Sequence, residues 1–241
     1  MTLEMFEESN EGIRLPHPPL PLRVHLVVES AICAAWELMT NRGRTGFDLQ
    51  TANEDTVTLE FYERLYDEVF NKGMVDGFDR EVFASIHREP KVRNFNRRHP
   101  DKMPDLLVDF IDRPAGVMNS QHGLFIECKP VDQKHPTGSA YCDEGLIRFV
   151  RGDYAWAMQS AMMVGYAREG YSLVPKLSEA LASKRKEPIP TSFGPESCLR
   201  TTATAFAEQV AISKHQRTFS YVENDLPAGI IVIRHLWLRR G

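Results

Sequence analysis

The fold is decided by two stretches, PDLLVDF (104–110) and GLFIECKPV (123–131). Both are rich in aliphatic and aromatic residues and are separated by turn-forming residues, which predicts two short β-strands. Each stretch nevertheless carries charge, because Asp105 opens the first and Glu127 and Lys129 lie inside the second. Charged groups in a core strand are costly unless something compensates them, so these three residues are candidates for a functional site.

Glu127 and Lys129 are predicted to share one face of their strand, because residues two apart point to the same side of a sheet. A divalent cation would compensate the carboxylates, since one or two carboxylates with waters and phosphate oxygens suffice for Mg²⁺. A lysine beside it would stabilise charge on a phosphate, or orient or deprotonate an attacking water. The alternative is structural: Glu127 and Lys129 form a buried ion pair or lie on a solvated face.

The acid-x-lysine pattern alone is weak evidence, because it occurs elsewhere in the chain. Glu89–Lys91 is interrupted by Pro90, and Asp132–Lys134 lies in a polar loop. Glu127–Lys129 differs from both because it lies inside an apolar strand, with a Pro-Asp step opening another strand upstream.

The composition is that of an ordinary globular protein of 241 residues. The net charge of −4 gives no global sign of nucleic-acid binding, so any basic surface must be local. No signal peptide and no apolar run of the roughly 20 residues that span a bilayer is visible. We therefore expect a soluble, cytoplasmic protein without a membrane partner.

The four cysteines, Cys33, Cys128, Cys142 and Cys198, form no C-x-x-C pair and are interpreted as reduced thiols. A zinc site built from Cys128, His135 and Cys142 is the alternative. The usual paired spacing of zinc ligands is missing there, which disfavours zinc.

The hydrophobic pattern predicts an α/β fold with a mixed sheet flanked by helices and an N-terminal helical addition. The predicted division is an extension over 1–50 and a main domain over 51–241. Asn53 is the predicted N-cap of the second helix. Helices are predicted over 23–39, 54–73, 144–152 and 153–170, and strands over 80–98 (as a strand or hairpin), 105–111, 123–131, near 208–215 and over 228–238.

Pro104-Asp105 followed by Glu127-Cys128-Lys129 resembles the motif of the PD-(D/E)xK nuclease superfamily. The resemblance covers roughly residues 50–170, where the order of predicted elements is also similar, and it implies a restriction-endonuclease-like core. It further implies a Mg²⁺- or Mn²⁺-dependent enzyme that hydrolyses DNA, with Asp105, Glu127 and Lys129 as catalytic residues. Restriction, repair or defence against foreign DNA is the implied setting, with a homodimer or a larger complex as the implied assembly.

Two other interpretations of the resemblance remain. The chain could be an inactive module that kept the nuclease fold for DNA binding or assembly, or its substrate could be RNA. The intact set of Asp105, Glu127 and Lys129 favours activity.

Many members of the superfamily add a glutamate from the helix before the strands. At ~100° per residue, Glu54 falls on the apolar, inward stripe of that helix, whereas Glu60 and Glu63 are predicted to face solvent. Glu54 is therefore the predicted third metal ligand, beside Asp105 and Glu127. The alternative is that Glu54 only complements the helix dipole.

The segment from Arg88 to Lys102 is strongly basic and runs directly into Pro104-Asp105. Such a segment could bind a phosphate backbone, although each arginine could equally be an ordinary surface residue. Gln159, in the predicted helix 153–170, would contact the substrate or hydrogen-bond to backbone. The predicted nucleic-acid-binding residues are Arg93, Arg97, Arg98, Arg148 and Gln159.

Overall fold

The computed structural model describes residues 12–41, 47–183, 191–192 and 210–240. The helices in these ranges are α1 (Leu22–Asn41), α2 (Glu54–Glu63), η1 (Arg64–Phe70), η2 (Asn119–Gln121), η3 (Thr137–Leu146), α3 (Ile147–Arg151) and α4 (Leu173–Ala182). The strands are β1 (Phe83–Arg88), β2 (Leu106–Phe110), β3 (Gly123–Val131), β4 (Ser160–Ala167), β5 (Thr191–Ser192), β6 (Val210–Gln216) and β7 (Ile230–Arg239).

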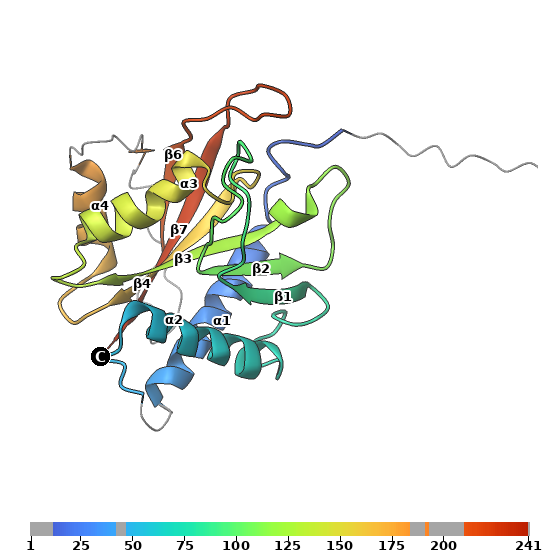
Figure 1. The fold of residues 1–241 in the computed structure, drawn as a ribbon. Coiled ribbons are helices and arrows are strands. Elements are labelled where there is room, and N and C mark those ends of the chain that lie inside the picture. The colour runs from blue at the N-terminus through green and yellow to red at the C-terminus, as the bar shows by residue number, and fades with distance from the viewer. Residues whose placement is uncertain (1–11, 42–46, 184–190, 193–209, 241) are drawn as a thin grey trace, which may run out of the picture.

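The strands of the described residues form one mixed sheet in the order β1-β2-β3-β4-β7-β6-β5 (Figure 1). Strands β3, β4 and β7 run parallel to one another at the centre, and the outer pairs are antiparallel. The predicted α/β class, with a mixed sheet flanked by helices, is confirmed.

Two hydrophobic clusters cover the two faces of the sheet. Helices α1, α2 and η1 pack on the face that carries Ile126 and Cys128 of β3. Helices η3, α3 and α4 pack on the opposite face, which carries Phe125 and Val131. Strand alternation places Glu127 on the second face, toward η3 and α3.

Helix α1 is tied to β7, although about two hundred residues separate them. The indole nitrogen of Trp36 donates to the carbonyl oxygen of Arg239 over 2.7 Å. Buried Glu29 of α1 pairs with Arg234 of β7. The helix predicted as an N-terminal addition therefore shares its core with the sheet, and the predicted boundary at residue 50 stays a prediction.

The predicted helix over 153–170 is wrong. Residues 160–167 form β4, in which every residue is buried between the neighbouring strands β3 and β7. A central parallel strand is covered on both faces and therefore reads as a continuous apolar run, which periodicity does not distinguish from a buried helix. The remaining residues before β4 form turns.

Other elements agree more closely with the sequence. The predicted strand over 123–131 is confirmed as β3, and Asn53 caps α2 by accepting from the backbone of Thr56. The predicted strand over 80–98 is confirmed only as β1, since the chain beyond it is a loop with an isolated bridge between Val92 and Lys102. None of the helices in the described residues is long and apolar enough to cross a membrane.

Candidate functional site

Asp105 lies beside β3 because of the strand register. Leu106 pairs with Ile126, so Asp105, one residue earlier, lies next to Glu127 and Cys128. Its Oδ2 accepts a hydrogen bond from the backbone N–H of Cys128 over 2.6 Å. The Pro-Asp step is thus fixed to the strand that carries Glu127 and Lys129.

Lys129 lies close to carboxylates from three segments of the chain: α2, the residue before β2, and β3 itself. Its Nζ lies 2.5 Å from Oε1 of Glu54 and 3.3 Å from Oε1 of Glu127. Glu54 is the first residue of α2, so the N-terminal end of this helix lies beside Lys129 of β3. The structure therefore places Glu54, Asp105, Glu127 and Lys129 close together, and their role as a site stays a prediction.

Glu127 is completely buried and is contacted from the helical side as well. Arg148 of α3 lies 3.0 Å from Oε1, and the hydroxyl of Tyr154 donates to Oε2. Tyr154 was not predicted from the sequence, because it lies in a turn after α3 and no spacing rule links that turn to β3. These six residues, Glu54, Asp105, Glu127, Lys129, Arg148 and Tyr154, are called the Lys129 cluster below.

Helix η3 approaches β3 closely at the cluster because it carries Gly145. A β-carbon at this position would lie 2.8 Å from Cε of Met163, 3.3 Å from Cγ of Lys129 and 3.6 Å from Cγ of Glu127. The absence of a side chain therefore lets the helix pack directly over the stems of the two charged residues.

Burial and like charge shift the acids of the cluster toward protonation. Burial, reinforced by the charge of Glu127, raises the pKa of Asp105 from 3.8 to about 7. Burial also raises the pKa of Glu127, although the cations Lys129 and Arg148 oppose that shift. The carboxyl group of Asp105 therefore gains or loses its proton near neutral pH, and shifted pKa values of this kind are common at functional sites.

The lysine shifts in the opposite direction. Burial alone would lower the pKa of Lys129, but the carboxylates of Glu127, Asp105 and Glu54 outweigh it and raise that pKa above its ordinary value. Lys129 consequently keeps its proton at neutral pH. Of the three roles considered from the sequence, stabilising charge and orienting a water fit a protonated lysine, and deprotonating a water does not.

The residues whose chemistry suits a divalent cation are Glu54, Asp105 and Glu127. Carboxylate oxygens are the ligands that Mg²⁺ and Mn²⁺ prefer, and one or two of them suffice when water completes the shell. Within the described residues, no group of three or more acidic, histidine or cysteine side chains is arranged to hold a metal. The ammonium of Lys129 instead lies between two of the carboxylates. The three carboxylates therefore match Mg²⁺ and Mn²⁺ in the type of ligand atom that they offer.

Glu60 was predicted to face solvent, and that prediction is wrong. It is buried and pairs with Arg64, which is equally buried, with Nε of the arginine 3.0 Å from the carboxylate. The ion pair compensates the burial of both charges. Glu63 is half-buried, and neither glutamate belongs to the Lys129 cluster.

The structure separates the predicted nucleic-acid-binding residues. Arg93, Arg97 and Arg98 are exposed in the loop between β1 and β2, and Arg97 pairs with Glu223 at 2.6 Å. Arg148 belongs to the cluster. Gln159 lies just before β4, where its side chain donates to the carbonyl oxygen of His17 over 2.7 Å, outside the cluster.

The cysteines provide no metal site in the described residues. Cys33, Cys128 and Cys142 are buried, and in the described part of the chain they do not form a metal-holding group with His135. His135 instead contacts Asp132. Cys198 lies outside the described residues.

A separate cavity of about 470 Å³ lies away from the cluster. Its walls come from the segment before α1, the start of α1, the turn before β1, the end of β2 and the residue before β3; they include Pro18, Leu20, Phe110 and His122. None of the residues predicted from the sequence to form the site lines it.

Comparison with known proteins does not assign the site. No protein-family model matches the chain, and neither the curated proteins nor the solved structures contain a match. The chemistry of the Lys129 cluster is therefore the basis for assigning a function.

Proposed function

We propose that the chain is a Mg²⁺- or Mn²⁺-dependent nuclease that hydrolyses phosphodiester bonds in DNA. The observation that carries this proposal is the gathering of Glu54, Asp105 and Glu127 around the protonated Lys129. The element order supports it: helix α2, strand β1, the Pro-Asp step before β2, Glu-x-Lys in β3, then helices η3 and α3. That order is similar to the one expected from the resemblance to PD-(D/E)xK nucleases, whose core we propose for this chain.

Each residue of the cluster has a chemical role in this proposal. A bound metal would neutralise phosphate charge and lower the pKa of a water molecule. Asp105 and Glu127 would hold it from the strands and Glu54 from the helix. Lys129 would stabilise the negative charge that develops on the phosphate oxygens. Arg148, whose side chain is 39% exposed, would donate charge-assisted hydrogen bonds to the same phosphate.

A second function is favoured by one observation. Both oxygens of Glu127 are already engaged, one by Lys129 and Arg148 and the other by Tyr154. A carboxylate satisfied in this way suits an inactive module that keeps the fold for DNA binding or assembly. The two functions differ in whether a divalent cation displaces these partners.

The test is cleavage of plasmid, linear and single-stranded DNA with Mg²⁺, Mn²⁺ or EDTA. We expect Asp105→Asn and Glu127→Gln to reduce metal-dependent cleavage about a thousandfold, because each removes a ligand and a fixed charge. Asp109→Asn is the matched control: it changes another acid, on β2, that pairs with Arg113 outside the cluster. Full cleavage by either cluster variant would overturn the assignment.

DNA binding without cleavage in any metal would favour the inactive module instead. For an active enzyme, binding in Ca²⁺ should survive Lys129→Met while chemistry is abolished, because the lysine acts in the transition state. The setting in restriction, repair or defence and a homodimer or larger complex are proposed on the resemblance. The cytoplasmic location is proposed on the sequence features described above, which are the cysteine pattern and the lack of a visible signal peptide.

A further inference from the structure

The loop that leads into α2 is held by two arginines that directly follow strands β4 and β7 of the sheet. Residues 48–53 precede Glu54, the only residue that α2 contributes to the Lys129 cluster among those described. The loop has local turn contacts of its own, since Asp48 accepts from the backbone of Gln50 and the hydroxyl of Thr51. Those contacts shape the turn but do not attach it to the sheet.

Arg240, directly after β7, provides that attachment. Its Nε donates to the carbonyl oxygen of Leu49 over 3.0 Å, and its Nη2 donates to that of Ala52 over 2.8 Å. The side-chain amide of Gln50 donates back to the carbonyl oxygen of Arg240. Arg240 is only 4% exposed. The carbonyl oxygens of the loop therefore replace water as hydrogen-bond acceptors for its buried guanidinium. The planar fork of donors is what allows one side chain to reach two carbonyls.

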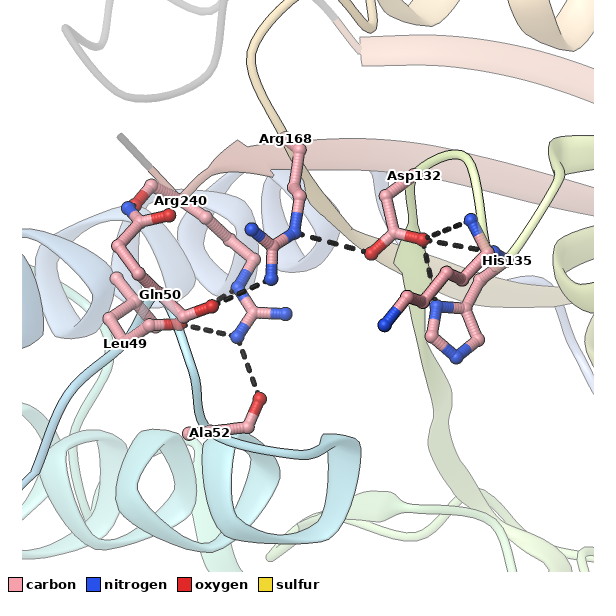
Figure 2. A network of polar contacts seen from close by, with 8 residues as sticks. Leu49, Gln50, Ala52, Asp132, His135, Arg168 and Arg240 are labelled. Atoms are coloured by element: carbon pink, nitrogen blue, oxygen red, sulfur yellow. Dashed lines mark hydrogen bonds and ion pairs between the residues drawn. The ribbon is translucent and has the colours of Figure 1, made fainter.

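Arg168, directly after β4, makes a parallel contact. Its Nη2 donates to the carbonyl oxygen of Gln50 over 2.6 Å, and its Nε lies 3.3 Å from Oδ2 of Asp132. Asp132 follows β3 and is itself fixed, because Oδ1 accepts from the backbone and the ring of His135 at 2.9 Å. Figure 2 shows both guanidiniums facing the loop from the sheet side.

The geometry therefore joins the carboxyl ends of three parallel strands to one loop. Strands β3, β4 and β7 end at the same edge of the sheet. Ala52, held by Arg240, is two residues before Glu54, and Asn53 between them caps α2. The position of Glu54 relative to Lys129 thus depends on this attachment as well as on the helix.

We propose that Arg240, assisted by Arg168, is a positioning residue for the proposed nuclease site. It fixes the loop 48–53 so that Glu54 reaches Lys129, where its carboxylate would help to hold a bound metal. This inference rests on the proposed function. Neither arginine contacts a residue of the cluster in the described part of the chain, and both contact the loop that leads to Glu54. The effect of Arg240 on catalysis is therefore expected to pass through Glu54. A mispositioned ligand weakens metal binding and chemistry even when the fold is intact.

The test is Arg240→Lys, with Arg217→Lys as the matched control. Arg217 is also 4% exposed and also donates to backbone carbonyls, those of Trp156, Met158 and Gly229, none of which belongs to the loop 48–53 or to α2. We expect Arg240→Lys to raise the Mg²⁺ concentration for half-maximal cleavage about threefold or more, and Arg217→Lys to leave it unchanged. Equal shifts in both variants would mean general destabilisation and would overturn the proposal.

A second measurement does not require activity. Hydrogen exchange of the amides of residues 49–55 should become about tenfold faster in Arg240→Lys and remain unchanged in Arg217→Lys. Arg168→Gln, at a half-exposed position, repeats the test if Arg240→Lys does not fold. Unchanged exchange in the arginine variants would overturn the attachment itself, whereas a wild-type chain that never cleaves DNA would refute only the nuclease assignment.

A double-mutant cycle isolates Glu54. Glu54→Gln and Arg240→Lys should each weaken Mg²⁺ dependence, and the double variant should be no worse than Glu54→Gln alone, because both changes act at one ligand. Additive losses would show that Arg240 acts by another route and would contradict the proposal.

Discussion

Asp105 gives the folded protein a titration in the neutral range. Burial and the charge of Glu127 raise its pKa from 3.8 to about 7, whereas the unfolded chain loses this proton near pH 4. Between those values the folded state binds more protons than the unfolded state. The contribution of this residue to stability therefore decreases as pH rises from about 4 to about 7.

We expect Asp105→Asn to remove this pH-dependent loss of stability. The variant keeps a side-chain oxygen that can accept the hydrogen bond from the backbone N–H of Cys128. The variant should match the wild type near pH 4 and be more stable at pH 8, by at most about 4 kcal/mol. Denaturant unfolding of both proteins between pH 4 and 8 measures the difference. A difference independent of pH would show that Asp105 ionises normally.

The residues of the site differ in how far the sequence could predict them. Glu127 and Lys129 follow from the two-residue period of a strand, and Glu54 from the periodicity of a helix. Tyr154 could not be predicted, because its contact with Glu127 depends on the path of a turn. The sequence suggested a phosphate contact for Arg148 but did not indicate that its partner in the structure is Glu127.

At the scale of elements, the packing of η3 on β3 carries a prediction. Gly145→Ala should lower cleavage about tenfold, because the added methyl group displaces Lys129 and Met163 by a few tenths of an ångström. Alanine is otherwise the better helix former, so we expect only a small change in melting temperature. Steady-state cleavage and thermal unfolding of the same preparation measure the two effects.

Gly229→Ala is the control, since a β-carbon there meets nothing within 4 Å. It should leave both cleavage and melting temperature near the wild-type values. A parallel loss of activity in the two glycine variants would argue against close packing of η3 as the cause.

The elements themselves divide into two groups in how well they could be predicted. β2 and β3 carry branched and aromatic residues between clear turn signals, and their positions follow from the sequence. β4 is rich in alanine and methionine and buried on both faces, so its pattern is that of a buried helix as much as a strand. Its place between β3 and β7 is a property of the tertiary structure, which local sequence does not contain.

For the whole molecule, DNA binding should depend on the loop between β1 and β2. The backbone N–H of Glu89 donates to the carbonyl oxygen of Asp105 over 2.9 Å, so the basic loop begins next to the cluster. Replacing Arg93 and Arg98 by glutamine should weaken binding about equally for unrelated sequences. It should also reduce the slope of log affinity against log salt by about 1 for each arginine that neutralises a phosphate in the wild type.

Titrations of fluorescent duplexes in Ca²⁺ at several salt concentrations measure that slope. Arg80→Gln with Arg113→Gln is the matched control, because it removes the same charge from outside this loop. If the control reduces the slope as much as the loop variant does, net charge rather than the loop governs binding.

The contact between α1 and β7 also sets an order of events during protein synthesis. Trp36 and Glu29 are synthesised more than two hundred residues before their partners Arg239 and Arg234. Until then the apolar side of α1 lacks the strand against which it finally packs. Helix α1 can pack on α2 and η1 before then, but its contact with the sheet is completed only after translation has passed β7.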